Sequence, residues 1–271
     1  MDFSSTAVWI ALAIAFGAGL ATTLGSVLVL TAKQTNTRLL AFGLAFSGGA
    51  MVYVSLVEIF VKANAAFTKS AGEKMGYTWA TLFFFAGVAL LVAIDRLVPN
   101  PHGGTNEAGL LARPEGDNID RKQIARVGLM AALAITAHNL PEGLATFFAT
   151  LDNPVVGAPL AFAIAVHNIP EGVSIAIPVY YATGSKTKAV LATFLSGLAE
   201  PFGAVVGYML LAPFLNDFVF GAVFAIIAGA MVFLALDELL PAARKYARGH
   251  ETVYGIVIGM AAMALSLVLF K

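Results

Sequence analysis

Residues 138–143 read His-Asn-Leu-Pro-Glu-Gly, and residues 167–172 read His-Asn-Ile-Pro-Glu-Gly. Both copies lie inside strongly apolar stretches, where an ionisable side chain is costly and is therefore a candidate functional residue. The copies are 29 residues apart, a separation that fits one membrane crossing and a turn. We interpret the pair as the chain's clear internal repeat, and it predicts two antiparallel helices that face each other inside a bilayer.

The composition is that of a membrane protein with several spans. Of the 271 residues, 59% are hydrophobic and 12% are charged, whereas a soluble domain has about 25% charged residues. The net charge is zero and no basic tail is present, which argues against a nucleic-acid partner. The absence of cysteine excludes disulfides and thiolate metal sites. The first apolar run has no basic segment before it, so we expect a retained span and not a cleaved signal peptide.

The number of spans follows from the length of the apolar stretches, because a crossing needs about 20 mostly apolar residues. We predict an all-α polytopic membrane protein with eight transmembrane helices, forming one transmembrane domain over residues 1–271. Consecutive helices run antiparallel and carry the motif at similar depth, which indicates inverted-repeat character. The segment 99–122 is rich in Gly, Asn, Pro and charge and predicts a flexible cytoplasmic loop. The predicted spans are 7–31, 38–61, 76–97, 124–150, 155–181, 187–211, 217–240 and 252–270.

The positive charges predict the orientation of the chain. With eight spans and the N-terminus outside, the inner loops hold 12 of the 16 Lys and Arg residues, as the positive-inside rule requires. Both termini are then extracytoplasmic. We expect a multi-pass protein of a cell membrane, in a bacterium the inner membrane. The sequence does not determine the oligomeric state, and a homodimer remains compatible with it.

Each copy of the motif offers several metal donors on one turn of helix. Residues four apart lie on one helical face, so the histidine and the glutamate of each copy point the same way. Pro141 and Pro170 each leave a backbone carbonyl without its helical donor, and water or an ion could satisfy that carbonyl. Two facing copies supply enough nitrogen and oxygen donors for one or two divalent ions. The candidate ligands are His138, Asn139, Glu142, His167, Asn168 and Glu171.

Acidic residues recur in or near the predicted spans, whereas no Lys or Arg lies well inside them. Buried charges must be paired, metal-bound or protonated, so bound metal or protons are expected. Glu58 is either an access-path carboxylate or an interfacial residue. Asp237 and Glu238 are either exit-path or ligand groups or members of an interfacial ion pair. The six acidic residues are Glu58, Glu142, Glu171, Glu200, Asp237 and Glu238.

This donor set favours a metal carrier over an enzyme. Imidazole and carboxylate without thiolate suit Zn²⁺, Fe²⁺, Mn²⁺, Co²⁺ or Cd²⁺ more than Cu⁺ or Mg²⁺. The alternative is an intramembrane metalloenzyme, either a metal-dependent hydrolase or a di-iron oxidase. The chain lacks His-Glu-x-x-His, and its histidine precedes its glutamate, unlike the Glu-x-x-His of di-iron bundles. We therefore expect no catalytic residues and no cofactor, with the metal as the transported substrate.

At these residues the chain resembles the ZIP family of divalent-metal transporters, most closely its bacterial zinc-uptake branch. The resemblance also covers Ala-Glu-Pro at 199–201, Asp-Glu-Leu at 237–239 and the long third loop. It implies uptake of metal into the cytoplasm through a two-metal site held by helices 4, 5 and 6. It places the first metal on His138, Glu142, His167 and Glu171, and the second on Asn139, Glu142, Asn168, Glu171 and Glu200.

Overall fold

The computed structural model describes residues 5–31, 37–97, 121–152, 154–247 and 249–269. Every regular element in these ranges is a helix, as the predicted all-α class requires. The predicted loop 99–122 lies outside them, apart from its last two residues, which begin a helix. The helices are α1 (Ser5–Thr31), α2 (Thr37–Val54), α3 (Phe60–Ala71), α4 (Glu73–Leu97), α6 (Arg121–Asp152), α7 (Pro154–Thr183), α8 (Lys186–Gly197), α9 (Ala199–Leu211), α10 (Asp217–Leu234), α11 (Leu240–Tyr246) and α12 (Glu251–Leu269), with π-helical turns η1 (Ser55–Ile59) and η3 (Ala235–Leu239) and a 3₁₀ turn η2 (Ala212–Phe214).

Within the described ranges, seven segments are long and apolar enough to cross a membrane, which makes the chain a multi-pass membrane protein. Each of the seven coincides with one of the eight predicted spans. The remaining predicted span, 124–150, falls on α6, which is a continuous helix of 32 residues but is not one of the seven. The seven segments are Thr6–Val27, Ala41–Ala71, Glu73–Ala93, Leu160–Ile177, Lys186–Phe214, Asp217–Arg244 and Glu251–Leu269.

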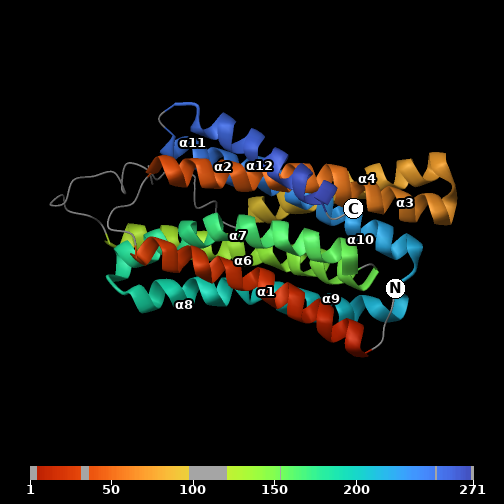
Figure 1. The fold of residues 1–271 in the computed structure, drawn as a ribbon, viewed down its shortest axis with the longest axis horizontal. Coiled ribbons are helices and arrows are strands. Elements are labelled where there is room, and N and C mark those ends of the chain that lie inside the picture. The colour runs from red at the N-terminus through yellow and green to blue at the C-terminus, as the bar shows by residue number, and fades with distance from the viewer. Residues whose placement is uncertain (1–4, 32–36, 98–120, 153, 248, 270–271) are drawn as a thin grey trace.

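The helices pack as two bundles that lie side by side (Figure 1). The first bundle, called here the motif bundle, consists of α1, α6, α7, α8 and α9. The second bundle consists of α2, α3, α4, α10, α11 and α12. The two meet mainly where α2 packs against α7 and, less extensively, where α10 packs against α6. Both copies of the repeated motif therefore belong to one bundle.

Helices of the motif bundle approach most closely at glycines of the motifs. A Cβ at Gly143 of α6 would overlap the backbone carbonyl of Glu200 on α9. A Cβ at Gly172 of α7 would likewise overlap the backbone carbonyl of Thr22 on α1. Each motif glycine thus seats its helix against a different neighbour, and only a residue without a side chain fits at either contact.

The helix that contains the second predicted span, 38–61, is longer than predicted. The helix continues through η1 and α3 to Ala71, and Gly72, at φ 81°, then reverses the chain into α4. Lys62 lies inside this span, where its Nζ is 3.8 Å from Glu58 Oε1. The statement that no Lys or Arg lies well inside a span therefore fails at Lys62. The physical reason is that a lysine one helical turn from a glutamate can be buried as part of a pair.

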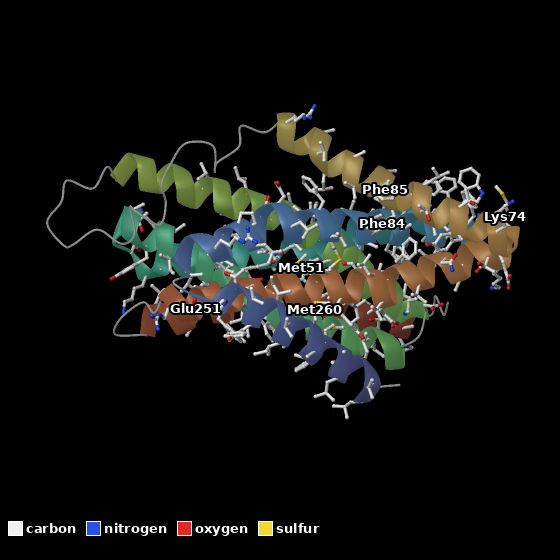
Figure 2. All side chains as sticks on the ribbon, turned by 90° about the horizontal axis from the view of Figure 1, so that it is seen from above. Met51, Lys74, Phe84, Phe85, Glu251 and Met260 are labelled. Atoms are coloured by element: carbon white, nitrogen blue, oxygen red, sulfur yellow. The ribbon has the colours of Figure 1, made fainter. Side chains whose placement is uncertain are left out.

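Two charged and two apolar residues show how the side chains are distributed along and across the molecule. Lys74, at the start of α4, and Glu251, at the start of α12, lie at opposite ends of the long axis, while Met51 lies between the helices near the middle (Figure 2). Met51 is fully buried, whereas Phe85 is 61% exposed on the outer surface of α4. Large exposed apolar side chains of this kind occur on many of the helices, as expected for surfaces that face lipid.

Candidate metal centre

Three helices contribute the candidate ligands of the motif bundle. The motif copies lie within α6 and α7, with Pro141 and Pro170 inside their helices. The third segment is a break in the sixth predicted span, where α8 ends at Gly197 and α9 begins at Ala199. Pro201 has no N–H to donate to the preceding turn, which accounts for the break. As a result, Glu200 projects from the first turn of α9.

All five candidate ligands that the structure describes in this bundle are completely buried. Buried polar groups normally have hydrogen-bond partners, and buried charges are paired or bind metals. A group of three carboxyls and two amides withdrawn from solvent therefore needs a specific compensating interaction. The five residues are Asn139, Glu142, Asn168, Glu171 and Glu200.

Hydrogen bonds to the backbone hold both asparagine amides in one orientation. Asn139 Nδ2 donates to the carbonyl of Ser196 over 3.0 Å. Asn168 Nδ2 donates to the carbonyl of Ala18 over 3.1 Å and also to Glu200 Oε1. Both Oδ1 atoms, and Glu200 Oε2, are buried and have no hydrogen-bond partner among the described residues. The nitrogen ends are thus occupied by protein, whereas the oxygen ends remain available to a cation.

The carboxylates of this group lie close enough to interact. Glu200 Oε1 accepts a hydrogen bond from Asn168, which lies one turn before Glu171 on α7, and the Cα of Glu200 adjoins Gly143, the residue that follows Glu142. Mutual repulsion between buried carboxylates is costly unless protons or cations compensate it. The helices therefore gather three buried carboxyl groups and two buried amides inside the bundle.

The side chains of His138 and His167 lie outside the described residues, although their backbones belong to α6 and α7. Among the side chains that the structure does describe, no three His, Asp or Glu groups form a metal-binding cluster by themselves. The predicted first site, which needs both histidines, therefore remains a prediction. What the structure brings into direct contact is Asn168 of α7 and Glu200 of α9, with Gly143 of the first motif copy packed against the backbone of Glu200.

The other three predicted pathway residues belong to the second bundle. Glu58 is 6% exposed and lies in η1. Asp237 and Glu238 lie in η3, where Asp237 is exposed and Glu238 is half-buried. Both π-helical turns make their main contacts with helices of the second bundle. The structure thus separates these three acidic residues from the donors of the motif bundle.

The sequence analysis missed a second repeat, which contains two of these residues. Residues 49–52 and 229–232 both read Gly-Ala-Met-Val, and each is followed six residues later by a glutamate, Glu58 or Glu238. Each copy leads into a π-helical turn, η1 or η3. Such turns inside α-helices frequently mark functional sites. The identical order at a separation of 180 residues was the signal that could have revealed the pair.

The Glu58–Lys62 pair leads to a prediction about stability. In Lys62→Met, we expect the free energy of unfolding to fall by roughly 1–3 kcal/mol, because Glu58 loses the cation beside it. The side chains of Lys62 and Glu58 are only 17% and 8% exposed. Thermal unfolding in detergent measures the loss, and adding Glu58→Gln should restore part of it.

Lys69→Met is the matched control for that experiment. Lys69 Nζ lies 3.0 Å from Asp217 Oδ2, but these side chains are 73% and 47% exposed. Exposed pairs contribute little to stability, so Lys69→Met should leave the unfolding temperature nearly unchanged. An equal loss in both lysine variants would contradict a structural role for the buried pair.

Comparison with known proteins agrees with these observations. The profile of the ZIP Zinc transporter family matches residues 99–267. The chain is 62% identical over 268 residues to the "Zinc transporter ZupT" of Xanthomonas axonopodis pv. citri, covering 99% of this chain and 97% of that protein. It is 60% identical over 264 residues to the protein of the same name from Stenotrophomonas maltophilia K279a, covering 97% of each chain. Identity to that of Neisseria meningitidis serogroup B is 60% over 269 residues, covering 99% of this chain and 98% of the relative. This chain therefore belongs to the ZIP family of zinc transporters.

Proposed function

We propose that the chain carries divalent transition-metal cations into the cytoplasm through the buried donors of α6, α7 and α9. Its similarity to proteins named as zinc transporters makes it a divalent-metal carrier and not an enzyme. Zn²⁺ is the principal substrate. Fe²⁺, Mn²⁺, Co²⁺ and Cd²⁺ fall within the same range, because nitrogen and oxygen donors do not discriminate sharply among them.

The observation that carries this proposal is the hydrogen bonding of the side-chain amides of Asn139 and Asn168. The nitrogens of Asn139 and Asn168 donate to backbone carbonyls, while their oxygens are buried without a hydrogen-bond partner among the described residues. A buried acceptor left unsatisfied costs roughly 1–3 kcal/mol. A metal cation accepts electron pairs from both oxygens and also compensates the neighbouring carboxylates, whereas an apolar or anionic substrate does neither.

The proposed ligands form two adjacent sites that share carboxylates. Sharing places two cations beside three buried acidic groups, which brings the charges close to balance. It also lets an ion move from one site to the next without leaving its ligands. The first site is His138, Glu142, His167 and Glu171, and the second is Asn139, Glu142, Asn168, Glu171 and Glu200.

We also propose eight membrane crossings with both termini extracytoplasmic, in the bacterial inner membrane. Seven of these crossings are long and apolar enough to be recognised by composition. The eighth is α6, which is less apolar because it carries the polar residues of a motif. The matching glycine contacts of α6 with α9 and of α7 with α1 support an inverted repeat. In this arrangement Glu58 lies on the access side, and Asp237 and Glu238 lie on the exit side. Assembly as a homodimer stays a prediction.

The test is radioactive zinc uptake into proteoliposomes by the intact protein, Asn139→Leu and Asn168→Leu. We expect each leucine variant to lose about tenfold or more in uptake at limiting zinc, a loss comparable to that for groups supporting a metal site. Asn139→Asp and Asn168→Asp keep an oxygen donor and should retain more uptake. Asn64→Leu is the control, because the Oδ1 of Asn64 is likewise buried without a hydrogen-bond partner among the described residues but lies on α3 of the second bundle. Undiminished uptake by both motif leucine variants would refute metal passage at these amides.

A further inference from the structure

Two contacts relate Thr22 on α1 to Glu200 on α9. The carbonyl of Glu200 blocks a Cβ at Gly143, and the carbonyl of Thr22 blocks a Cβ at Gly172. Gly143 and Gly172 are the last residues of the two motif copies, 29 positions apart. The backbone of Thr22 therefore contacts α7 in the same way as the backbone of Glu200 contacts α6.

Two hydrogen bonds, each four residues earlier in α1 or in the α8–α9 segment, repeat this relation. Asn139 donates to the carbonyl of Ser196, four residues before Glu200, and Asn168 donates to that of Ala18, four residues before Thr22. Between these two segments, a Cβ at Gly19 would lie 3.4 Å from the Cβ of Glu200. A Cβ at Gly197 would lie 3.4 Å from the Cβ of Thr22.

This equivalence places the Thr22 side chain on the inner side of α1. The Glu200 side chain starts beside Gly19 and reaches Asn168 on α7. Because the Thr22 side chain starts beside Gly197 in the same relation, the equivalence predicts that it extends toward the Asn139 amide on α6. The two side chains are then expected to approach the donor group from opposite sides.

The hydroxyl of Thr22 is buried without a hydrogen-bond partner among the described residues, as is that of Thr146 on α6. Thr22 as a whole is 0% exposed. Thr150 and Thr193 are also buried, but each hydroxyl donates to a carbonyl of its own helix, over 2.7 Å and 2.8 Å. The Thr22 hydroxyl therefore remains available as an oxygen donor.

We propose that Thr22 is a further substrate ligand, whose neutral hydroxyl supplies an oxygen to the coordination shell of the metal from α1. The inference rests on the proposed function, because it adds one donor to the same group. It also explains why the two equivalent positions differ, with a carboxylate at Glu200 and a hydroxyl at Thr22. A carboxylate at this position would bring the buried acidic groups to four, and added ligand charge strengthens cation binding. A hydroxyl completes the shell without that charge, so the ion is bound and still released.

The experiment measures initial zinc uptake against zinc concentration, together with zinc binding in detergent. Thr22→Val has nearly the shape of threonine and removes only the oxygen, and we expect its KM and its Kd for zinc to rise about three- to tenfold. Thr22→Ser restores the oxygen and should return both values most of the way. Thr22→Asp should bind zinc about tenfold more tightly and turn over more slowly, because ligand charge strengthens binding.

Thr193→Val is the matched control, because it removes a buried hydroxyl of α8 that is already satisfied. Its KM and Kd should equal those of the intact protein. The inference is overturned if Thr22→Val matches Thr193→Val, or if Thr22→Ser fails to restore binding. A Glu142→Ala variant run in parallel separates the two levels of the argument. Full uptake by Glu142→Ala would refute the proposed function, whereas loss of uptake there with normal Thr22→Val would refute only the role of Thr22.

Discussion

Alanine in place of Glu142 or Glu171 is expected to lower zinc uptake into proteoliposomes by at least about 100-fold, since mutating groups that only support metal ligands already costs 10–100-fold. Both carboxyls are completely buried. Each is proposed as a ligand of both metals, so its removal takes an anionic oxygen donor from both sites at once. Uptake of radioactive zinc or cadmium, measured with and without a proton gradient, tests the loss.

The control for these variants is Glu73→Ala, at the exposed start of α4. It removes the same carboxylate from a solvated position and should leave uptake unchanged. The double variant Glu142→Ala/Glu171→Ala should lose less than the product of the single losses, because groups that act as a unit are not additive. Uptake that is equal in the intact protein and both single variants would end the assignment of transport to these carboxylates.

Gly143→Ala and Gly172→Ala are expected to lower the stability of the protein. Each new methyl group would overlap a backbone carbonyl, of Glu200 in one case and of Thr22 in the other. Backbone cannot rotate away as a side chain can, so the helices must separate. Overpacking of this kind costs about 1–3 kcal/mol, and occasionally more. The unfolding temperature in detergent and the yield of monodisperse protein measure the effect.

Gly17→Ala is the control for the glycine variants. Gly17 lies on the exposed side of α1 and has no neighbouring atom within 4 Å of the position its Cβ would take. Since alanine favours a helix by about 1 kcal/mol over glycine, this variant should be neutral or slightly more stable. If Gly143→Ala and Gly172→Ala unfold at the same temperature as Gly17→Ala, the close approach of α6 to α9 and of α7 to α1 is wrong.

The metal-donor residues could be predicted from the sequence because polar and ionisable side chains are costly, and therefore rare, inside a bilayer. A histidine, an asparagine and a glutamate on one turn of an apolar helix have few roles besides binding, and the exact duplication made chance an inadequate explanation. Glu200 was identified as an acidic residue of an apolar span, but its role as a ligand of the second metal came only from the resemblance to the ZIP family. Thr22 carried no sequence signal at all, because a threonine in an apolar helix is ordinary and its meaning depends on which helix lies opposite.

Other features were misread because they depend on partners distant in space or on local pairing. The end of the second predicted span was placed before Lys62, since a lysine normally marks the membrane surface. The pairing with Glu58 lets the helix continue to Ala71. The π-helical turns η1 and η3 leave no mark in hydropathy, although they follow the overlooked Gly-Ala-Met-Val repeat.

By itself, the sequence determined the helical membrane class, the approximate spans and the residues of the repeated motif. These follow from local chemistry, because backbone groups in lipid must be satisfied within a helix and polar side chains there require a reason. The tertiary structure alone decided which helices meet, which ends of Asn139 and Asn168 remain available, and that Thr22 faces α7 as Glu200 faces α6. Those properties arise where helices far apart in the chain come within contact distance, and no pattern along a single helix records its neighbour.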